Sequence, residues 1–300
     1  MKKKEVLLFF TIFCFLFFSF LGCADKKVHS DKISVCASIL PQQYFIERIG
    51  GNKISVEIIV RPGQSPELYE PTPKQIIKLS NSVLFFAIGV PFEEKFIPAI
   101  KATIKNIKII DTSVGVKKRY LEKHSHKEGE NTEDHEGGDD PHIWLSPLSV
   151  KIQAKTICDA LSEIDPQNRE YFKKNLEDFL ADLDIIYKEI KAELEQFKGK
   201  TIFVFHPAFG YFTDEFGLYQ ESIETGGKEP TPVTLMKIIN HAQEEQIKII
   251  FVQPEFSKKN AETIANAVNA KVVELNSLSP DYLNNLRKIT EEIKNSLLIE

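Results

Sequence analysis

Two histidines of this chain stand in settings that would hold an imidazole ring in one place. His142 follows Pro141 and lies two residues before Trp144, the only tryptophan of the sequence. His206 directly follows the apolar run 201–205 and precedes another proline. A fixed, neutral imidazole is a good ligand for zinc and for other divalent metals. A buried structural histidine would give the same local pattern, so neither histidine identifies a metal site by itself.

Polar side chains that would complete a metal site follow other predicted strands. Glu67 lies in the proline-rich loop after an apolar strand, Glu255 follows a strand that ends near residue 252, and Asn276 follows one that ends at residue 275. In parallel α/β sheets, ligands bind at the carboxyl ends of the strands, where these loops begin. Two imidazoles and a carboxylate suit Zn²⁺ and are acceptable for Mn²⁺. An amide oxygen is a poor zinc ligand, so we expect water or a displaced carboxylate at the fourth position.

Strands and helices alternate along most of the chain. Apolar runs typical of buried strands are separated by amphipathic helices, and this alternation predicts parallel sheets with helices on both faces. The predicted strands cover residues 33–39, 54–60, 83–88, 107–110, 201–205, 218–223, 247–252 and 272–275. The sequence therefore predicts an α/β fold with two parallel-sheet lobes.

One long helix is predicted to separate the two lobes. It begins at Pro166 and continues to about Phe197, with apolar residues spaced by threes and fours and with no internal Gly or later Pro. About 30 residues at ~1.5 Å each give a rod of about 45 Å. The predicted boundaries are an N-terminal lobe over 33–165, a linker helix over 166–198 and a C-terminal lobe over 199–300.

The first residues have the pattern of an export signal. Lysines precede an apolar run from Val6 to Leu21, which is too short and too close to the terminus to predict a membrane span. The run ends in a sequence that resembles a bacterial lipobox, which predicts a signal peptide over 1–22, a lipid-modified Cys23 and a tether over 23–32. Ordinary signal cleavage and an uncleaved anchor are the alternatives.

The net charge argues against a nucleic-acid partner. The whole chain has a formal net charge of −5, and loss of residues 1–22, with three Lys and one Glu, would change it to −7. No basic stripe remains that would follow a phosphate backbone. The acidic balance is compatible with a cationic ligand, although net charge alone is weak evidence for one.

The segment 117–140 interrupts the alternation of strands and helices. From residue 122 to residue 140 it contains eight acidic residues, two Lys and three His, namely His124, His126 and His135. A segment with so few apolar side chains cannot bury enough surface to offset the entropy of ordering, so we predict a disordered loop. Its histidines and carboxylates would bind divalent metal loosely, and a plain solvated loop is the alternative.

Two cysteines lie in the predicted globular part of the chain. Cys36 falls in a predicted strand and Cys158 in a predicted helix. No Cys-x-x-Cys pair is present, which excludes a thiolate metal cage. We expect two buried thiols rather than a disulfide.

Four motifs together resemble one family. They are Pro-x-x-x-Pro-Glu-Leu-Tyr-Glu-Pro-Thr-Pro (62–73), Asp-Pro-His-Ile-Trp-Leu-Ser-Pro (140–147), Phe-His-Pro-Ala-Phe-Gly-Tyr-Phe (205–212) and Gly-Lys-Glu-Pro-Thr-Pro (227–232). In this order they resemble the zinc/manganese substrate-binding lipoproteins of bacterial ABC transporters. The resemblance implies two lobes joined by a rigid backbone helix, one metal ion in the cleft between them, and the two histidines as ligands. A His- and acid-rich loop like 122–140 is typical of the zinc-specific members.

The chain departs from the family pattern at two positions. Glu67 stands where the family usually has its first histidine ligand, and Asn276 stands where it usually has an acidic fourth ligand. The expected ligands are therefore Glu67 and the two histidines, completed by water, Asn276 or Glu255. Other nearby acids are expected as supporting or loop charges, namely Glu70, Asp139 and Asp140.

The resemblance implies a carrier rather than an enzyme. We expect a lipid-anchored monomer that captures Zn²⁺ outside the cytoplasmic membrane and delivers it to an ABC-type permease, with an affinity that falls as the pH drops through ~6.5. A Mn²⁺ or Fe²⁺ carrier of the same type is the first alternative. A zinc-dependent hydrolase would use similar ligands, but the chain has no His-Glu-x-x-His helix and no evident general base. A surface metal buffer or adhesin is the third alternative.

Overall fold

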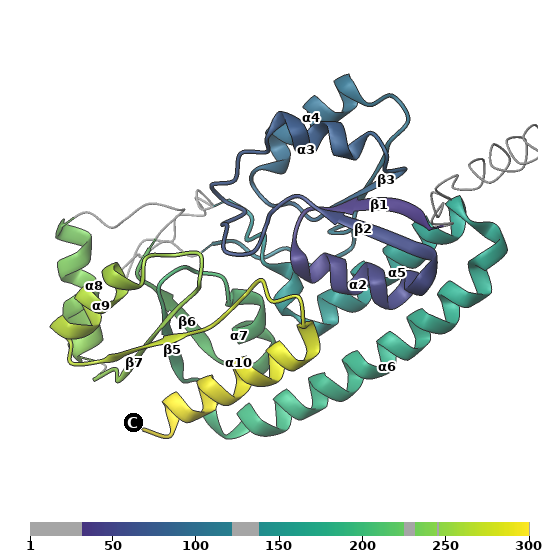
Figure 1. Cartoon of the computed structure of the whole chain (residues 1–300). Helices are drawn as coiled ribbons and strands as arrows, with labels where there is room; N and C mark the ends of the chain where they lie inside the picture. The colour runs from purple at the N-terminus through teal and green to yellow at the C-terminus, as the bar shows by residue number, and fades with distance from the viewer. Residues whose placement is uncertain (1–31, 122–137, 225–231, 245, 300) are drawn as a thin grey trace, which may run out of the picture. The chain divides into compact units, whose positions relative to one another are not determined.

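Two four-stranded parallel sheets and the helices that cover them make up the fold (Figure 1). It is seen in a computed structural model that describes residues 32–121, 138–224, 232–244 and 246–299. Residues Ile33–Glu300 form one compact unit. The α/β fold class predicted from the alternation of apolar runs is confirmed.

The first sheet has the strand order β2-β1-β3-β4. Its strands are β1 (Ile33–Ala37), β2 (Ile54–Ile58), β3 (Leu84–Ala87) and β4 (Lys108–Asp111), and the helices of this lobe are α2 (Leu40–Gly50), α3 (Pro73–Leu79) and α4 (Glu93–Thr103). All four residues of the central strand β3 are buried, as a strand covered on both faces requires. The edge strand β2 has exposed and less exposed positions in alternation instead.

The second sheet repeats this topology with the order β6-β5-β7-β8. Its strands are β5 (Thr201–Val204), β6 (Tyr219–Ser222), β7 (Ile249–Val252) and β8 (Lys271–Glu274), and its helices are α7 (Gly210–Phe216), α8 (Pro232–Glu244) and α9 (Lys258–Ala267). Because β5 pairs with β6 on one side and β7 on the other, the direction of the strand order reverses between β5 and β7. Loops that leave the sheet at such a point are where ligands bind in open parallel sheets.

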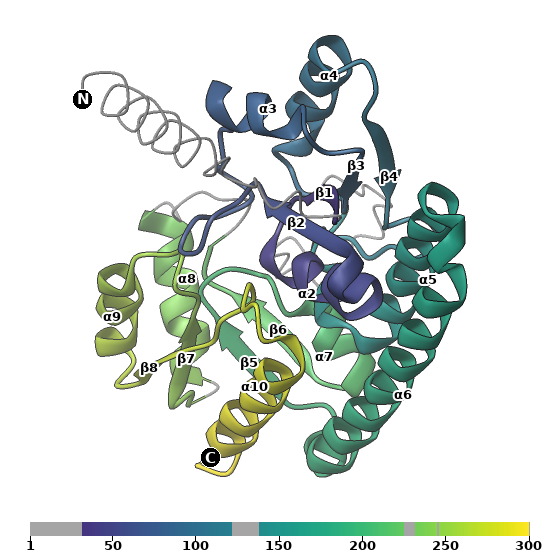
Figure 2. The same ribbon diagram turned by 45° about the vertical axis from the view of Figure 1, so that its right-hand side comes forward.

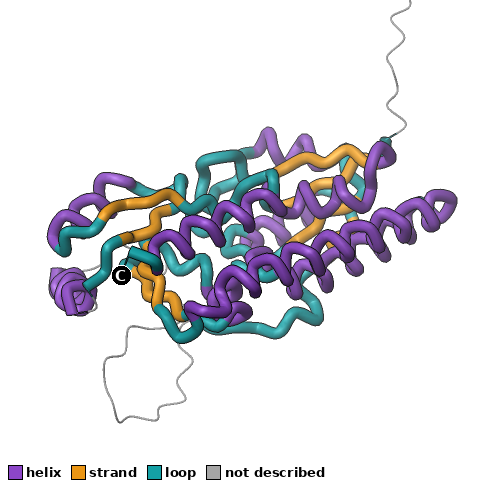
Figure 3. Tube along the Cα trace, turned by 90° about the horizontal axis from the view of Figure 1, so that it is seen from below, coloured by secondary structure: helices purple, strands orange, loops and turns teal. Residues whose placement is uncertain are grey.

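Three long helices lie outside the strand–helix alternation: two come between the sheets in the chain, and one follows the last strand. They are α5 (Pro147–Ile164), α6 (Arg169–Leu194) and α10 (Tyr282–Leu297). The predicted linker helix appears as the 26 residues of α6, extended at each end by a short 3₁₀ turn (Pro166–Asn168 and Glu195–Phe197). At ~1.5 Å per residue, α6 alone is about 39 Å long. It lies beside α5 and α10 (Figures 2 and 3), and it also packs against α2.

The helix α6 buries one stripe against both lobes because its apolar residues recur every three or four positions. Its buried residues are Phe172, Phe179, Leu183, Ile186, Ile190 and Leu194. Phe45 of α2 meets Tyr282 of α10 edge to face, with ring centroids 4.8 Å apart. One apolar cluster therefore runs from the first sheet through these helices to β5, and a smaller cluster fills the space under α8 and α9.

The two cysteines are free and buried, as predicted. Cys36 lies in β1 and Cys158 in α5. Burial raises the pKa of both thiols, and the carboxylate of Glu57 adds to this effect at Cys36. Thiols with raised pKa values are mostly protonated at neutral pH, so they act as small apolar side chains in the core.

Several predicted features lie outside the described residues. They are the signal peptide 1–22, the lipid-modified Cys23, most of the tether, and the loop histidines His124, His126 and His135. In the described part, no helix has the length and apolar character needed to cross a lipid bilayer.

The two ends of the predicted loop 117–140 are described, and they pair with each other. Tyr120 and Asp139 form an antiparallel bridge. Next to it, the Asp140 N–H donates to the Arg119 carbonyl oxygen at 2.8 Å. These contacts fix the base of the segment on both sides, two residues before His142.

Candidate metal centre

Three side chains predicted as metal ligands meet in the structure. The Nε2 atoms of His142 and His206 are 3.3 Å apart. Oε1 of Glu67 lies 3.2 Å from the first of these atoms and 3.5 Å from the second. Both histidines are buried and Glu67 is nearly so, with 15% of its side chain exposed. These three residues form the only group of three or more His, Cys, Asp or Glu side chains in the described part of the chain whose ligand atoms are close enough to share a metal ion.

Local structure explains how each ligand reaches this point. His142 begins a 3₁₀ turn (Ile143–Leu145), and its ring lies 5.1 Å from the ring of Trp144. The indole N–H of Trp144 donates to the Ser277 carbonyl oxygen in the other lobe at 2.8 Å. The turn therefore anchors His142 between the lobes.

The second histidine comes from the switch point of the second sheet. His206 follows β5, and its ring stacks on Phe256 with centroids 4.6 Å apart and an interplanar angle of 21°. Its carbonyl oxygen accepts a hydrogen bond from the Gln253 side chain at 2.8 Å. Stacking and hydrogen bonding together leave the ring little freedom to rotate.

The carboxylate of Glu67 comes from the proline-rich loop between β2 and α3. The Ser65 hydroxyl donates to its Oε2, and the Glu67 N–H donates back to Ser65 Oγ at 3.3 Å. This local turn occupies one carboxylate oxygen and leaves Oε1 facing the two histidines. The family usually has a histidine at this position. Glu67 also places a ligand atom at the centre, through its carboxylate oxygen.

A buried carboxylate orients each imidazole. Nδ1 of His142 lies 2.7 Å from Asp140 Oδ1, and Nδ1 of His206 lies 2.6 Å from Glu224 Oε2. A carboxylate at Nδ1 holds the proton on that nitrogen, so the lone pair of the neutral ring is on Nε2. Both Nε2 atoms face the shared centre, which is the arrangement that binds a metal.

Sequence reasoning anticipated one of these two carboxylates and missed the other. Asp140 is among the three acids that the sequence suggests as supporting or loop charges, together with Glu70 and Asp139. Glu224 was not considered, yet it lies two residues after β6, at a strand exit like those of the predicted ligands. Applying the strand-exit rule to every strand would have found it. Of the other acids, Asp139 pairs with Lys118, and Glu70 is exposed.

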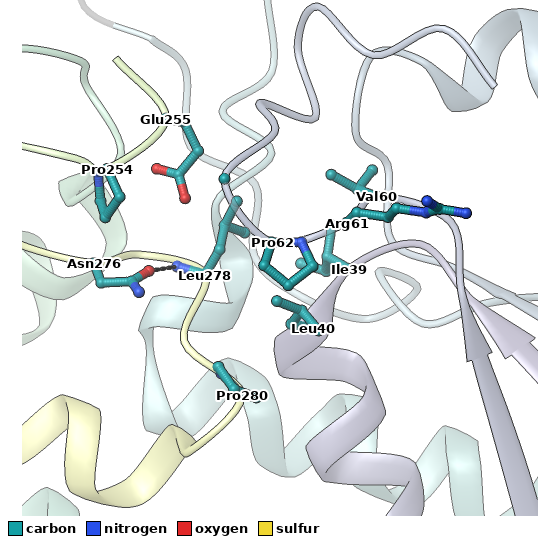
Figure 4. A pocket seen from close by; sticks show the side chains of 11 residues that line it. Ile39, Leu40, Val60, Arg61, Pro62, Pro254, Glu255, Asn276, Leu278 and Pro280 are labelled. Carbon is teal, nitrogen blue, oxygen red and sulfur yellow. Dashed lines mark hydrogen bonds between the residues drawn. The ribbon is translucent and has the colours of Figure 1, made fainter. Parts of the chain in front are cut away.

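Asn276 and Glu255, the two predicted candidates for the fourth ligand, line a nearby cavity of about 140 Å³ (Figure 4). Oδ1 of Asn276 accepts a hydrogen bond from the Leu278 N–H at 2.8 Å, so this oxygen is already engaged. Glu255 does not belong to the group of three ligand atoms. Its carboxylate projects toward the cavity in Figure 4, and burial and the nearby Glu67 raise its pKa. The structure thus brings together three of the five candidates.

The charges at the centre stabilise one another. Burial alone would raise the pKa of Glu67, but its contacts with both histidines hold that pKa well below its usual range. Burial alone would lower the pKa of His142, but Asp140 and Glu67 outweigh it and raise the pKa to about 9. The same balance, with Glu224 in place of Asp140, raises the pKa of His206. Without a metal, the centre therefore favours protonated imidazoles.

Zinc binding at pH 7 should release protons from this centre. A raised imidazole pKa means that the proton persists above pH 6.5 and must leave before Nε2 binds a metal. Apparent zinc affinity should therefore rise with pH until about 9, instead of levelling off above ~6.5 as rings of ordinary pKa would predict. Calorimetry at pH 7 in buffers of different ionisation enthalpy should give about one proton or more released per zinc. Binding without proton release would contradict this prediction.

Fold and site together define a class of protein: an α/β protein with two lobes and a divalent-metal site between them. The chain belongs to the family described as zinc-uptake complex component A, periplasmic (ZnuA), which matches residues 35–296. The predicted resemblance is confirmed, and so is the prediction of a solute-binding protein rather than an enzyme.

Individual relatives agree with this assignment. The chain is 30% identical to the high-affinity zinc uptake system protein ZnuA of Bacillus subtilis, over 100% of both chains. It is 27% identical to the zinc-binding lipoprotein AdcA of Streptococcus pneumoniae, covering 97% of this chain but 57% of that longer protein. A solved structure of ZnuA is 35% identical, covers 89% of this chain and 99% of its own, and superposes with a TM-score of 0.81. A ZnuA deletion mutant with zinc bound has the same identity and TM-score, covering 89% of this chain and 98% of its own.

Proposed function

We propose that this protein captures Zn²⁺ outside the cytoplasmic membrane and delivers it to an ABC-type permease, with Glu67, His142 and His206 as the ligands. The observation that carries the proposal is the spacing of the three ligand atoms, 3.2, 3.3 and 3.5 Å. Zinc bonds of about 2.0–2.1 Å to nitrogen and oxygen, at tetrahedral angles, separate neighbouring ligand atoms by about 3.3–3.4 Å. The three atoms therefore already stand at three corners of a zinc-sized tetrahedron.

The fourth corner is proposed for water or for the carboxylate of Glu255. Zinc with one carboxylate and two neutral imidazoles keeps a net positive charge, which a second carboxylate would neutralise. Glu255 lines the neighbouring cavity and follows β7, which pairs with β5, the strand that precedes His206. The amide of Asn276 is a weaker candidate, because its oxygen already accepts the Leu278 N–H.

The placement of the ligands suggests how the metal is released. Glu67 and His142 precede the linker helix, whereas His206 follows it. Any separation of the two lobes would pull the ligands apart and weaken the site. A carrier needs this reversible release, whereas a hydrolase would need a stable site and a base for water.

The membrane anchor is proposed from the sequence. Cys23 in its lipobox-like setting would carry the lipid, and a relative described as a zinc-binding lipoprotein supports this reading. A role of His124, His126 and His135 as auxiliary zinc ligands stays a prediction. Monomeric action likewise stays a prediction.

Growth and metal uptake of a deletion strain test the proposal. We expect poor growth at limiting zinc, rescued by zinc or by the intact gene, and unchanged growth at limiting manganese. Protein purified from its own host without added metal should contain about one zinc per chain. Binding affinity alone would not decide, because most sites of this kind prefer Zn²⁺ to Mn²⁺ in vitro. A strain rescued only by manganese or iron would point to the alternative carrier, and a strain with normal uptake of every metal would contradict transport.

A further inference from the structure

Arg119 contacts Asp140, the carboxylate that orients His142 of the metal centre. Its side chain is largely buried, with 10% exposed. Its Nη1 lies 3.1 Å from Asp140 Oδ2, and its Nε lies 2.9 Å from Asp214 Oδ2 in α7. One guanidinium therefore bridges the residue that holds His142 and a helix of the second lobe.

The two oxygens of Asp140 have separate partners. Oδ1 accepts the backbone N–H of His142 at 3.0 Å and faces Nδ1 of the same residue at 2.7 Å. Oδ2 faces Arg119. The side chain of Asp140 is fully buried, so water does not replace either partner. A carboxylate held at both oxygens has a fixed plane, and this plane sets the direction of the His142 ring.

The carboxylate behind the other histidine is held differently. Glu224 uses Oε2 for His206, and its buried Oε1 has no hydrogen-bond partner among the described residues. The second oxygen of Asp140, in contrast, faces the guanidinium of Arg119 at 3.1 Å. The guanidinium support is thus a specific feature of the His142 side of the centre.

Arg119 packs closely against the first two residues of α7. Its backbone N–H donates to the Tyr211 hydroxyl at 3.0 Å. A Cβ atom added at Gly210, the first residue of α7, would fall well inside van der Waals contact of the guanidinium. Gly210 therefore provides the space that the arginine occupies.

We propose that Arg119 is a positioning residue for His142, acting through Asp140, and that it makes the orientation of this ligand depend on α7 of the second lobe. The inference rests on the proposed function, since it concerns how one of the proposed ligands is held. Removal of the guanidinium leaves a buried carboxylate with one free oxygen, which is then able to rotate. Loss of such support behind a metal ligand typically reduces metal affinity by about 10–100-fold.

Two variants disturb this contact in different ways. Arg119→Gln removes the positive charge and the guanidinium that contacts two carboxylates. Gly210→Ala keeps the arginine but places a methyl group where its guanidinium lies. We expect both to weaken zinc binding by about 10-fold or more in competition with a chromogenic chelator, and Arg119→Lys to recover part of the loss. Lys118→Gln is the matched control, because the neighbouring Lys118 pairs with exposed Asp139 and should leave affinity unchanged.

Two spectroscopic readouts distinguish positioning from general damage. Cobalt(II) bound in place of zinc should show altered visible bands in Arg119→Gln and Gly210→Ala, and wild-type bands in Lys118→Gln. In the metal-free protein, the proton between His142 Nδ1 and Asp140 should give a downfield NMR signal that shifts or disappears in Arg119→Gln. Circular dichroism and thermal melting establish that each variant is folded.

The outcomes separate the two proposals. A wild-type protein that binds no zinc would overturn the proposed function, whatever the NMR signal shows. A wild-type protein that binds zinc, together with folded Arg119→Gln and Gly210→Ala variants of unchanged affinity and unchanged cobalt spectrum, would overturn the role of Arg119 alone.

Discussion

Replacing His142 or His206 with alanine should abolish tight zinc binding. Structural zinc sites are worth about 10–16 kcal/mol in apparent binding free energy, so each of three protein ligands contributes several kcal/mol, or roughly 10³-fold in affinity. The loss should be large because no other histidine of the described residues lies near enough to replace the missing ring. Competition with a chelator of known affinity, or calorimetry, measures the change.

His241→Ala is the matched control for this prediction. His241 lies in α8, where its Nε2 is 2.8 Å from Glu221 Oε2, and it does not belong to the metal centre. The control should bind zinc like the wild type. Undiminished affinity in both His142→Ala and His206→Ala would mean that the tight site lies elsewhere in the chain.

Replacing Glu67 with histidine should increase the selectivity for zinc over manganese. The carboxylate is a hard oxygen ligand that Mn²⁺ accepts readily, whereas an imidazole nitrogen favours Zn²⁺. The change also removes one negative charge, which weakens the attraction for any divalent cation, and only zinc gains a better ligand in return. We expect manganese affinity to fall by about 10-fold or more while zinc affinity changes less. Titrations with each metal, and with both in competition, provide the comparison.

Glu70→His serves as the control for Glu67→His. Glu70 lies three residues further along the same loop, but it is exposed and does not belong to the metal centre. This variant changes the charge of the loop in the same way and should leave selectivity unaltered. Equal effects of the two substitutions would indicate that the loop charge, and not ligation by Glu67, sets the preference.

Much of the fold was predictable because buried parallel strands and amphipathic helices leave simple patterns. Every predicted strand overlaps a strand of the structure, since short apolar runs are what a sheet covered on both faces requires. The observed boundaries of the elements differ from the predicted ones by a few residues. At Pro166, for example, a 3₁₀ turn precedes α6 where the sequence predicted the start of the long helix. Such shifts depend on local hydrogen bonds that a periodic pattern does not contain.

The candidate site was only partly predictable, for a physical reason. Strand-exit loops and proline-fixed turns indicated the residues that the structure brings together. Their supporting partners depend on contacts between distant segments: Glu224 is 18 residues from His206, and Asp214 is 95 residues from Arg119. Nothing in the sequence near Arg119 indicates a buried ion pair, because its burial comes from α7 of the other lobe.

The position of Trp144 makes its intrinsic fluorescence a probe of the metal centre. It is the only tryptophan of the chain, its ring is buried beside His142, and its N–H reaches the Ser277 carbonyl oxygen across the interface between the lobes. Indole emission depends on the polarity and hydrogen bonding around the ring, and with excitation above the tyrosine absorption band the signal comes from Trp144 alone. Stopped-flow fluorescence of the unlabelled wild type would therefore report the arrival of the ion, together with any change in the contact between the two lobes.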